Sequence, residues 1–503
     1  MKIKKLIACA AAAVLLGTGS VIPAAPVSAA GTMREISTME LVHDMGIGIN
    51  LGNTLECCVG WDQDDWVKAA NGGNPTAENY ETAWGSPVLS KELIAGMAKE
   101  GFGVLRIPVA WSNMMEHDGT YTISGKYCAR VHQVVDWTLE SGMYAIINIH
   151  WDGGWINNMP QNKDDAMFHF KHVWEQIADS FKDYDDYLMF ESQNEELGWE
   201  SVWNPWSGND QQKAQSYALC NEVNQAFVDV IRASGGNNPK RHLLISGYNT
   251  GFDRTCDSLF KMPNDPVNRM AVSVHYYSPA GFAILEEDAD WGKATPTWGS
   301  DQDYNSLRSE MEMMKTHFTD RGIPVIIGEY GCPSKNKEPA SVQRFLSAVC
   351  EEAYKRGHCP VMWSTPGGHY DRTAFRLVDQ ELQKKLYAIG GKPYQPRELS
   401  FGGDTPAQTT EPALTTTAAP ETTTTPAPAT TEAIGQGMAG DIDLNGDVNV
   451  ADAVLLARML AEDKDITVTA QGRANANVNG DSNVDSDDLT GILEYLAGLR
   501  QSF

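Results

Sequence analysis

Eight short, almost entirely apolar segments joined by helical stretches predict an α/β fold of the (β/α)8 barrel class. Segments of this kind are typical of parallel strands that are buried on both faces. The expected strands are Gly46–Leu51, Val104–Val109, Tyr144–Ile149, Tyr187–Glu191, His242–Ser246, Ala271–His275, Val325–Gly328 and Val361–Trp363. The pattern alone leaves a doubly wound sheet as the alternative.

Polar and aromatic side chains follow most of these strands, and their positions favour the barrel. A barrel brings the carboxyl ends of all its strands to one face, where its active site lies, whereas a doubly wound sheet spreads them along a wide edge. The strand-end residues are Arg106, His150, Asn194 and Glu195, His275 to Tyr277, Glu329 and Trp363.

Composition divides the 503 residues into four parts. A basic and then apolar start that ends in small residues predicts a signal peptide at residues 1–29, and hence secretion; a membrane anchor is the alternative. Residues 33–401 are predicted to form the barrel. Residues 402–437 are rich in Thr and Pro and cannot bury apolar area, so we expect a linker. Residues 438–503 carry their own apolar helical pattern and are predicted to form a small separate domain.

The formal net charge of the chain is −27 at pH 7. Such an acidic chain is a poor partner for nucleic acid and for anionic membranes because both are polyanions, which leaves neutral polymers and cations. The eight cysteines beyond the signal peptide lack zinc-binding spacings. We expect buried free thiols, although export also permits a disulfide.

Two glutamates, Glu195 and Glu329, each follow an apolar strand. A carboxylate in such a place loses solvation, so its presence indicates a function. One such function is glycoside hydrolysis by two carboxyl groups that flank the glycosidic bond. The first carboxyl group protonates the leaving oxygen, and the second attacks the anomeric carbon or activates a water. The alternative is that the two residues are unrelated members of ion pairs.

Seven motifs give the region from Met33 to Tyr387 a resemblance to glycoside hydrolase family 5, a family of barrel enzymes whose catalytic glutamates end strands four and seven. Two of these motifs, around Asn53 and Trp84, resemble a subfamily of bacterial endoglucanases that includes xyloglucanases and lichenases. The motifs are Gly48–Thr54, Glu81–Gly85, Arg106–Val109, Asn148–His150, Asn194-Glu195, His275–Tyr277 and Ile327–Gly331.

The resemblance implies roles for the residues that match the motifs. Glu195 matches the acid/base and Glu329 the nucleophile of a hydrolysis with net retention of configuration. Arg106 is expected to hold Glu329 ionised, since a nearby cation favours the charged form, and Tyr277 to donate a hydrogen bond to it. Asn194 matches the residue that binds the sugar 2-hydroxyl.

The remaining matches concern the sugar-binding groove. His150 and His275 match the two active-site histidines of the family, with His275 tuning Glu195 and His150 binding sugar hydroxyls. Trp363 matches the aromatic floor beneath the sugar, and Asn53 and Trp84 are expected to support the groove. No metal or other cofactor is expected for the chemistry.

Three departures from the family pattern leave the preferred polysaccharide open. Glu196 stands where the family commonly has Pro, Trp151 where it has a second His, and Ser364 where the subfamily has Asp. We expect an endo-β-1,4-glucanase, with xyloglucanase, lichenase, β-mannanase or xylanase activity as the alternatives. A binding protein without catalysis is the competing class, and the presence of both glutamates disfavours it.

Two loops of the last domain have the spacing of EF-hand-type calcium sites and begin 36 residues apart (477 − 441). Their predicted calcium ligands are oxygen-bearing side chains: Asp441, Asp443, Asn445, Asp447, Asn449 and Asp452 in the first loop, and Asn477, Asn479, Asp481, Asn483, Asp485 and Asp488 in the second.

An apolar helical stretch follows each loop, and the duplicated unit resembles a dockerin, a small all-α calcium-binding module. The resemblance implies a cohesin domain of a scaffoldin as the partner. Asn477 at the first position and Ser482 at the sharp turn predict that the second site is the weaker one.

Overall fold

The computed structural model describes residues 31–58, 65–116, 118–196, 202–399, 438–442, 444, 448, 450–460, 468–481, 483–496 and 500. The predicted signal peptide and linker lie outside these residues, as do Asp443, Asn445, Asp447 and Asn449 of the first predicted calcium loop. The chain divides into two compact units, residues 1–409 and 410–503.

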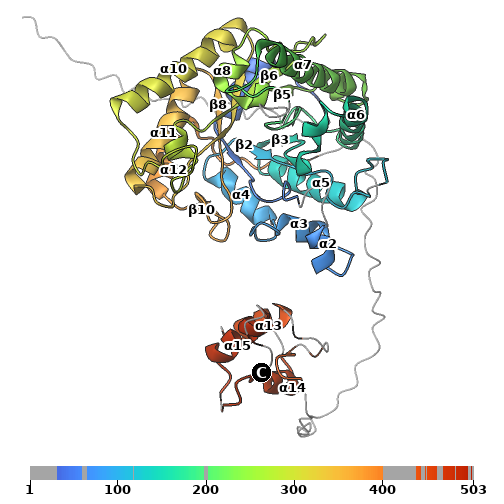
Figure 1. The fold of residues 1–503 in the computed structure, drawn as a ribbon, viewed down its shortest axis with the longest axis vertical. Helices are drawn as coiled ribbons and strands as arrows, with labels where there is room; N and C mark the ends of the chain where they lie inside the picture. The colour runs from blue at the N-terminus through green and yellow to red at the C-terminus, as the bar shows by residue number, and fades with distance from the viewer. Residues whose placement is uncertain are drawn as a thin grey trace, which may run out of the picture. The chain divides into compact units, whose positions relative to one another are not determined.

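The first unit contains a closed barrel of eight parallel strands, as the sequence predicts (Figure 1). Each strand pairs with the next along the chain, and β8 closes the barrel against β1. The ends of the predicted and observed strands differ by at most two residues. The strands are β1 (Gly48–Asn50), β2 (Val104–Ile107), β3 (Tyr144–Asn148), β4 (Leu188–Glu191), β5 (Leu243–Ser246), β6 (Met270–Tyr276), β7 (Val325–Tyr330) and β8 (Cys359–Met362).

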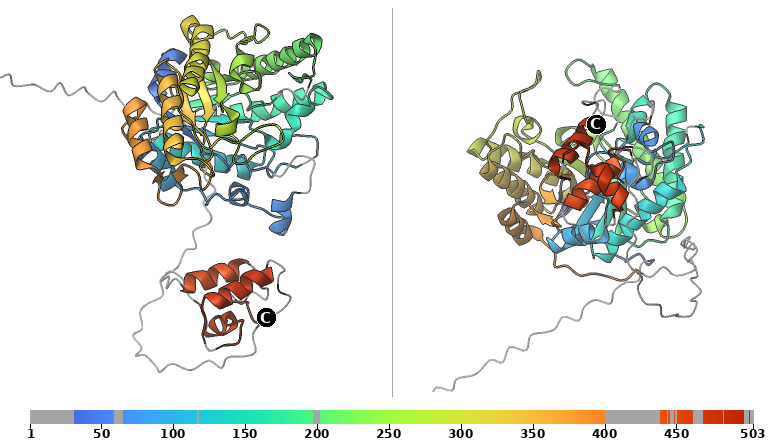
Figure 2. Two further views of the ribbon diagram at one scale, coloured as in Figure 1. Left: turned by 60° about the vertical axis from the view of Figure 1, so that its left-hand side comes forward. Right: turned by 90° about the horizontal axis from the view of Figure 1, so that it is seen from below.

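A helix follows every strand, and the helices surround the barrel (Figures 1 and 2). Side-chain caps fix where several begin; Ser300, for example, accepts from the backbone N–H of Asp303 at the start of α10, and Asp303 bonds back. In strand order the helices are α4 (Lys91–Lys99), α5 (Gly125–Glu140), α6 (Lys163–Ser180), α7 (Asp210–Ala233), α8 (Phe252–Thr255), α10 (Asp301–His317), α11 (Pro339–Tyr354) and α12 (Gln380–Gly390).

Shorter elements lie in the connections, and several of them shape the face that carries the strand ends. They are α2 (Trp66–Ala70) and α3 (Ala77–Glu81) after β1, η1 (Asp152–Asn158) after β3, η2 (Asn238–Lys240) before β5, η3 (Tyr248–Thr250) after it, α9 (Ala280–Ala283) after β6, η4 (Thr319–Arg321) before β7, and the hairpin of β9 (Tyr370–Asp371) and β10 (Arg376–Leu377) after β8.

Helix α1 (Thr38–Met45) closes the opposite end of the barrel. Ser37 forms a capping box with Glu40 at its start. The buried Leu41 and Met45 of this helix join one apolar cluster with side chains from the strand beginnings, such as Tyr144 and Val104. The amino end of the barrel is therefore sealed by apolar packing, and polar groups gather at the other end.

Register shifts in β6 and β7 set the side chains near the active end. The pairing of these strands shifts between Val274 and His275, so that His275 lies opposite Glu329. A bulge of this kind redirects the side chains beyond it. Gly328 fits the crowded site because a Cβ there would lie 2.8 Å from the hydroxyl of Ser273 and 3.2 Å from the ring of His275.

The second unit contains α13 (Val450–Leu460), α14 (Ala470–Ala476) and α15 (Ser486–Leu496), drawn in red in Figure 2. Its apolar core includes Ile442, Leu456 and Ile492. The carboxylate of Asp452 accepts from the backbone N–H of Ile442 at 2.6 Å, and that of Asp488 accepts from the N–H of Val478 at 2.9 Å. These four residues occupy equivalent positions of the two predicted loops, so the repeat in the sequence is also a repeat in the hydrogen bonding.

The cysteines at positions 57, 220, 332, 350 and 359 are buried free thiols, as expected, whereas Cys128 and Cys256 are only half-buried. The barrel core is large enough to be stable without a covalent cross-link. Among the residues that the structure describes, no helix combines the length and the hydropathy that a membrane span requires.

Candidate active site

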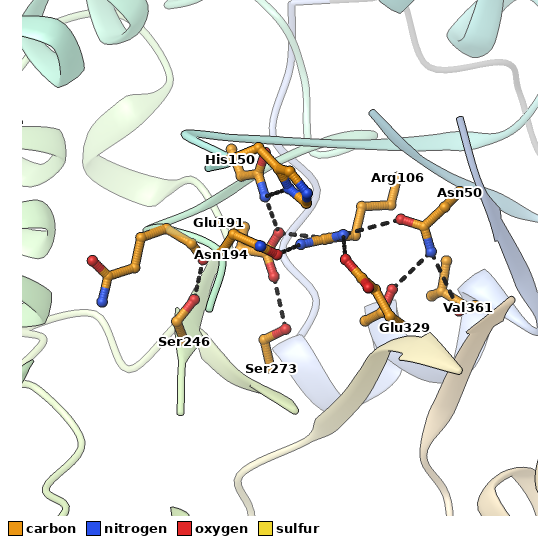
Figure 3. A network of polar contacts seen from close by, with 12 residues as sticks. Asn50, Arg106, His150, Glu191, Asn194, Ser246, Ser273, Glu329 and Val361 are labelled. Atoms are coloured by element: carbon orange, nitrogen blue, oxygen red, sulfur yellow. Dashed lines mark hydrogen bonds and ion pairs between the residues drawn. The ribbon is translucent and has the colours of Figure 1, made fainter. Parts of the chain in front are cut away.

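Arg106 is the centre of the polar network at the carboxyl ends of the strands, and it is fully buried. Its Nε lies 2.7 Å from Oε2 of Glu191, and its Nη1 lies 2.8 Å from Oε1 of Glu329. The guanidinium also donates to the side-chain oxygens of Asn50 and Asn194, each at 3.0 Å. Figure 3 shows Arg106 between Glu191 and Glu329. One buried cation thus connects strands β1, β2, β4 and β7.

Glu329 is held by donors on both of its oxygens. Oε1 receives Arg106, and Oε2 receives the hydroxyl of Tyr277 at 2.8 Å. Burial and the charge of Glu329 raise the pKa of Tyr277 well above its usual value, so its hydroxyl stays a neutral donor. The carboxylate is therefore fixed in one orientation beside a cation, which suits a nucleophile.

Glu195 is paired with His275. Nδ1 of His275 lies 2.6 Å from Oε1 of Glu195 and 3.7 Å from Oε2 of Glu329. Burial opposes a charge on His275, but the two carboxylates outweigh it and raise its pKa. Desolvation likewise opposes ionisation of Glu195, but the hydrogen bond and charge of His275 and the charge of Arg106 lower its pKa. The side chain of Glu195 is 44% exposed, so the shared proton lies where a substrate can reach it.

The loop after β5 supports Glu195 from the other side. The amide of Asn249 donates to the carbonyl oxygen of Glu195 at 2.8 Å, and the hydroxyl of Thr250 bonds to its carboxylate. Asn249 and Thr250 both have φ of 47°, a left-handed conformation that is unusual for a β-branched residue. Backbone strain at this place is a sign of a functional constraint, because it lowers stability unless the surrounding contacts compensate for it.

An aromatic surface borders this network. The rings of His150 and Trp363 are nearly parallel, with an interplanar angle of 6° and centroids 6.0 Å apart. Burial, together with the charges of Arg106 and His275, lowers the pKa of His150 far below its usual value, so its ring is neutral. Gly52 packs beneath Trp363, because a Cβ at Gly52 would lie 2.8 Å from the indole ring.

The structure gathers eight of the ten residues that the sequence places in the barrel site. Arg106, Asn194, Glu195, His275, Tyr277 and Glu329 share hydrogen bonds, and His150 and Trp363 stack beside them. Asn53 and Trp84 form no part of this network: the backbone N–H of Asn53 bonds to Glu56, and the indole of Trp84 is 39% exposed.

The sequence prediction did not include Glu191, which the structure places at the core of the site. This carboxylate is fully buried and accepts from Arg106, from the amide of Asn148 at 3.0 Å and from the hydroxyl of Ser273 at 2.7 Å. Asn50 and Thr250 were missed as well. A signal was present, because Glu191 and Asn50 are polar residues at the ends of otherwise apolar strands.

The atoms of Glu195, His275 and Glu329 that could bind a metal ion lie within 4.8 Å of one another. The hydrogen bonds of these three residues fit proton transfer better than metal binding. The distance of 2.6 Å between Glu195 and His275 is that of a charge-assisted hydrogen bond, and both oxygens of Glu329 already accept from donors.

Three other buried carboxyl groups lie around the site. Burial raises the pKa of Glu56 and of Asp152 to about 7. Burial and the charge of Glu195 raise the pKa of Glu196 to about 8, and the amide of Asn157 donates to Glu196 at 2.7 Å. At pH 7 the folded protein therefore holds a neutral acid directly beside the residue that matches the acid/base.

These shifts make the stability of the barrel depend on pH. In the unfolded chain Glu196 ionises near its ordinary pKa of about 4.3, whereas in the folded chain it stays protonated up to about pH 8. Folding therefore loses stability as pH rises through that window. We expect Glu196→Gln to stabilise the barrel at pH 8 by on the order of 1–3 kcal/mol and to change little at pH 4.

Denaturant unfolding at the two pH values measures the effect. Glu175→Gln is the control, because the carboxylate of Glu175 is 59% exposed. Equal pH dependence of Glu196→Gln and the parent chain contradicts the assignment of a buried neutral acid.

Comparison with known proteins identifies the family to which this active-site geometry belongs. A family model described as cellulase (glycosyl hydrolase family 5) matches residues 69–366. The cellulase/esterase CelE of Acetivibrio thermocellus is 36% identical over 74% of this chain and 44% of its own length. A xyloglucan-specific endo-β-1,4-glucanase of Bacteroides ovatus is 36% identical over 59% of this chain and 57% of its own length. The chain thus spans about half the length of these two relatives.

A solved structure agrees with these matches. The broad specificity endoglucanase of an uncultured bovine rumen ciliate is 33% identical, with a TM-score of 0.62 over 71% of this chain and 98% of its own length. The family match covers strands β2 to β8 of the barrel and both glutamates of the site. The chain belongs to glycosyl hydrolase family 5, the cellulase family.

Proposed function

We propose that this chain is a secreted endo-β-1,4-glucanase that hydrolyses internal β-glucosidic bonds of plant cell-wall polysaccharides with retention of configuration. Enzymes of glycosyl hydrolase family 5 are retaining and need no cofactor for catalysis. The observation that carries the proposal is the pairing of two strand-end carboxylates, one oriented by Arg106 and Tyr277, the other sharing a proton with His275.

In the first step Oε of Glu329 attacks the anomeric carbon, and Glu195 gives its proton to the glycosidic oxygen as the C–O bond breaks. The products are a glycosyl ester of Glu329 and a shortened sugar with a free hydroxyl. The proton reaches Glu195 from His275, because a sugar that displaces water from the site favours the neutral pair over the ion pair.

In the second step a water attacks the anomeric carbon, gives its proton to Glu195 and releases the carboxylate of Glu329. The ester has no negative charge, so part of the attraction that raises the pKa of His275 is absent during this step. Glu195 is then free to act as a base. Asn194 donates from its amide to the sugar 2-hydroxyl, since its oxygen is occupied by Arg106.

The choice of polysaccharide is tested by a reducing-sugar assay on carboxymethylcellulose, mixed-linkage glucan, xyloglucan, mannan and xylan. We expect the highest kcat/KM on a polymer with a β-1,4-glucan backbone. Xyloglucan is the second candidate, because the relative from Bacteroides ovatus is named as specific for it. A preference for mannan or xylan contradicts the proposal, as does a product whose first anomer, observed by NMR, is α.

We further propose that residues 438–503 are a dockerin that binds calcium and attaches the enzyme to a cohesin domain of a scaffoldin. The support is the repeat of loop and helix. Leu444 and Gly480, at the fourth position of the two loops, both have left-handed φ, of 65° and 74°. Asp452 and Asp488, at the twelfth position, make matching hydrogen bonds. Oxygen side chains at this spacing suit calcium.

Calcium removal is expected to abolish cohesin binding and to leave glucan hydrolysis intact. A small unit with a limited core gains stability from the bound metal, so chelation should unfold it and abolish cohesin binding. Hydrolysis of soluble glucan should persist, because the site in the barrel contains no calcium ligands in our proposal. Cohesin binding in a native gel and glucan hydrolysis, each measured on the full chain with excess chelator, test this. Cohesin binding that survives chelation contradicts the assignment.

A further inference from the structure

A shallow pocket of about 290 Å³ lies outside the catalytic network, and its walls combine aromatic and charged side chains. It is formed by residues 203–206 between β4 and α7, by the start of α7, and by residues 253–257 in and directly after α8. Helices α7 and α8 follow the neighbouring strands β4 and β5 (Figure 1). Its principal lining residues are Trp203, Trp206, Lys213, Tyr217, Asp253 and Asp257.

One of the two indole rings is fixed and the other is presented to solvent. The ring of Trp203 packs against Tyr217 and Tyr248, with centroids 6.2 and 6.1 Å apart. Gly208 allows this position, because a Cβ there would lie 2.4 Å from the Trp203 ring. Trp206 is 75% exposed, the highest exposure among the large apolar side chains in the described residues. A rigid floor beside an exposed indole is an arrangement that binds a flat apolar face.

The charges around the pocket balance. Lys213 and Arg254 provide two cations, and Asp253 and Asp257 provide two carboxylates; Nζ of Lys213 lies 2.5 Å from the carboxylate of Asp257. A pocket without net charge but rich in donors and acceptors favours a neutral ligand with many hydroxyl groups over an ion. A sugar ring has such hydroxyls at its edge and an apolar C–H face that packs on an indole.

Hydrogen bonds connect this pocket to the residue that matches the acid/base. The guanidinium of Arg254 donates to the side-chain oxygen of Asn249, and the amide of Asn249 donates to the carbonyl oxygen of Glu195. Because Glu195 protonates the leaving oxygen while Glu329 attacks from the opposite face of the sugar, the departing half of the chain lies on the side of Glu195.

We propose that this pocket binds a hexopyranose residue of the leaving half of the glucan chain, away from the cleaved bond, with Trp206 as its stacking surface. The inference rests on the proposed glucanase function and adds to it a determinant of substrate length. It also gives a function to the exposure of Trp206, which lies outside the network of Arg106.

The test compares kcat/KM on cellohexaose with kcat/KM on an aryl β-cellobioside, whose leaving group contains no sugar. In Trp206→Ala the ratio of the two values should fall about tenfold, which corresponds to about 1.4 kcal/mol of transition-state binding. Cleavage of reducing-end-labelled cellohexaose, followed by mass spectrometry, should also move toward the reducing end, because the leaving side has lost a contact. Trp206→Phe should restore most of the ratio.

Trp66→Ala is the matched control, since Trp66 on α2 is 51% exposed and lies outside this pocket; it should leave the ratio unchanged. An unchanged ratio in Trp206→Ala overturns the inference, as does an equal loss on both substrates, which indicates damage to the acid/base loop. A parent chain that hydrolyses neither substrate contradicts the proposed function itself and this inference with it.

Discussion

Glu329→Ala is expected to lower kcat/KM for hydrolysis of every substrate by roughly 10⁴-fold or more, because no other group can form the glycosyl ester. Glu195→Ala is expected to behave differently. It should lower kcat/KM on glucan by about 10² to 10⁴ but spare ester formation from an aryl glycoside with an acidic phenol, which needs little protonation to leave. Single-turnover release of the phenol measures that step.

Azide gives this comparison a control that depends on stereochemistry. In Glu329→Ala a small anion can enter the vacated space, displace the leaving group and give an α-glycosyl azide, with inversion. In Glu195→Ala azide attacks the ester of Glu329 instead and gives the β-glycosyl azide. Equal loss of phenol release in both variants, or the same azide anomer from both, shows that the two roles are assigned wrongly.

Glu191→Gln should lower kcat/KM by about 10- to 100-fold, or about 1.4 to 2.7 kcal/mol, while the barrel remains folded. The amide keeps an oxygen for Arg106 and Asn148 and offers its nitrogen to the hydroxyl of Ser273, so only the charge is lost. Arg106 then has Glu329 as its one carboxylate partner within the described site and binds it more strongly. A nucleophile that is better stabilised as a free anion is less reactive.

The split between kcat and KM separates this positioning role from general damage. A nucleophile that Arg106 holds more strongly slows the bond-forming step, so kcat and kcat/KM should fall together while KM changes little. Glu191→Ala is the contrasting variant: it leaves Nε of Arg106 and the donors of Asn148 and Ser273 without their acceptor and should destabilise the barrel by about 3–5 kcal/mol. Unaltered kinetics in Glu191→Gln, confirmed as folded by thermal unfolding, contradict the role proposed for its charge.

The fold could be predicted from sequence because each strand is a short apolar run that needs burial on both faces. The same reasoning located Glu195, Glu329 and Arg106, since a charged residue at the end of such a run is conspicuous. Glu191 is equally charged and also ends an apolar strand, but its importance depends on whether its side chain points into the site. The direction of the Glu191 side chain depends on the strand direction and the shear of the barrel, which the composition of the strand does not show.

Other features of the site depend on backbone geometry that side-chain patterns do not encode. Asn249 and Thr250 support Glu195 only because both adopt left-handed φ. Conversely, Asn53 belongs to a motif that resembles the family, yet its backbone bonds to Glu56, away from the network of Arg106. The site roles themselves stay predictions until the variants above are measured.

The irregular pairing of β6 with β7 has a consequence for anyone who redesigns this barrel. In a regular strand neighbouring side chains alternate between the two faces, so a single inserted or deleted residue reverses every side chain that follows. The shift is such a reversal, and β7 carries it: Val274 and His275 are consecutive in β6, whereas Gly328 separates their partners Ile327 and Glu329. A segment of β7 borrowed from a regular strand, without this extra residue, would therefore turn Glu329 to the opposite face and put Tyr330 in its place.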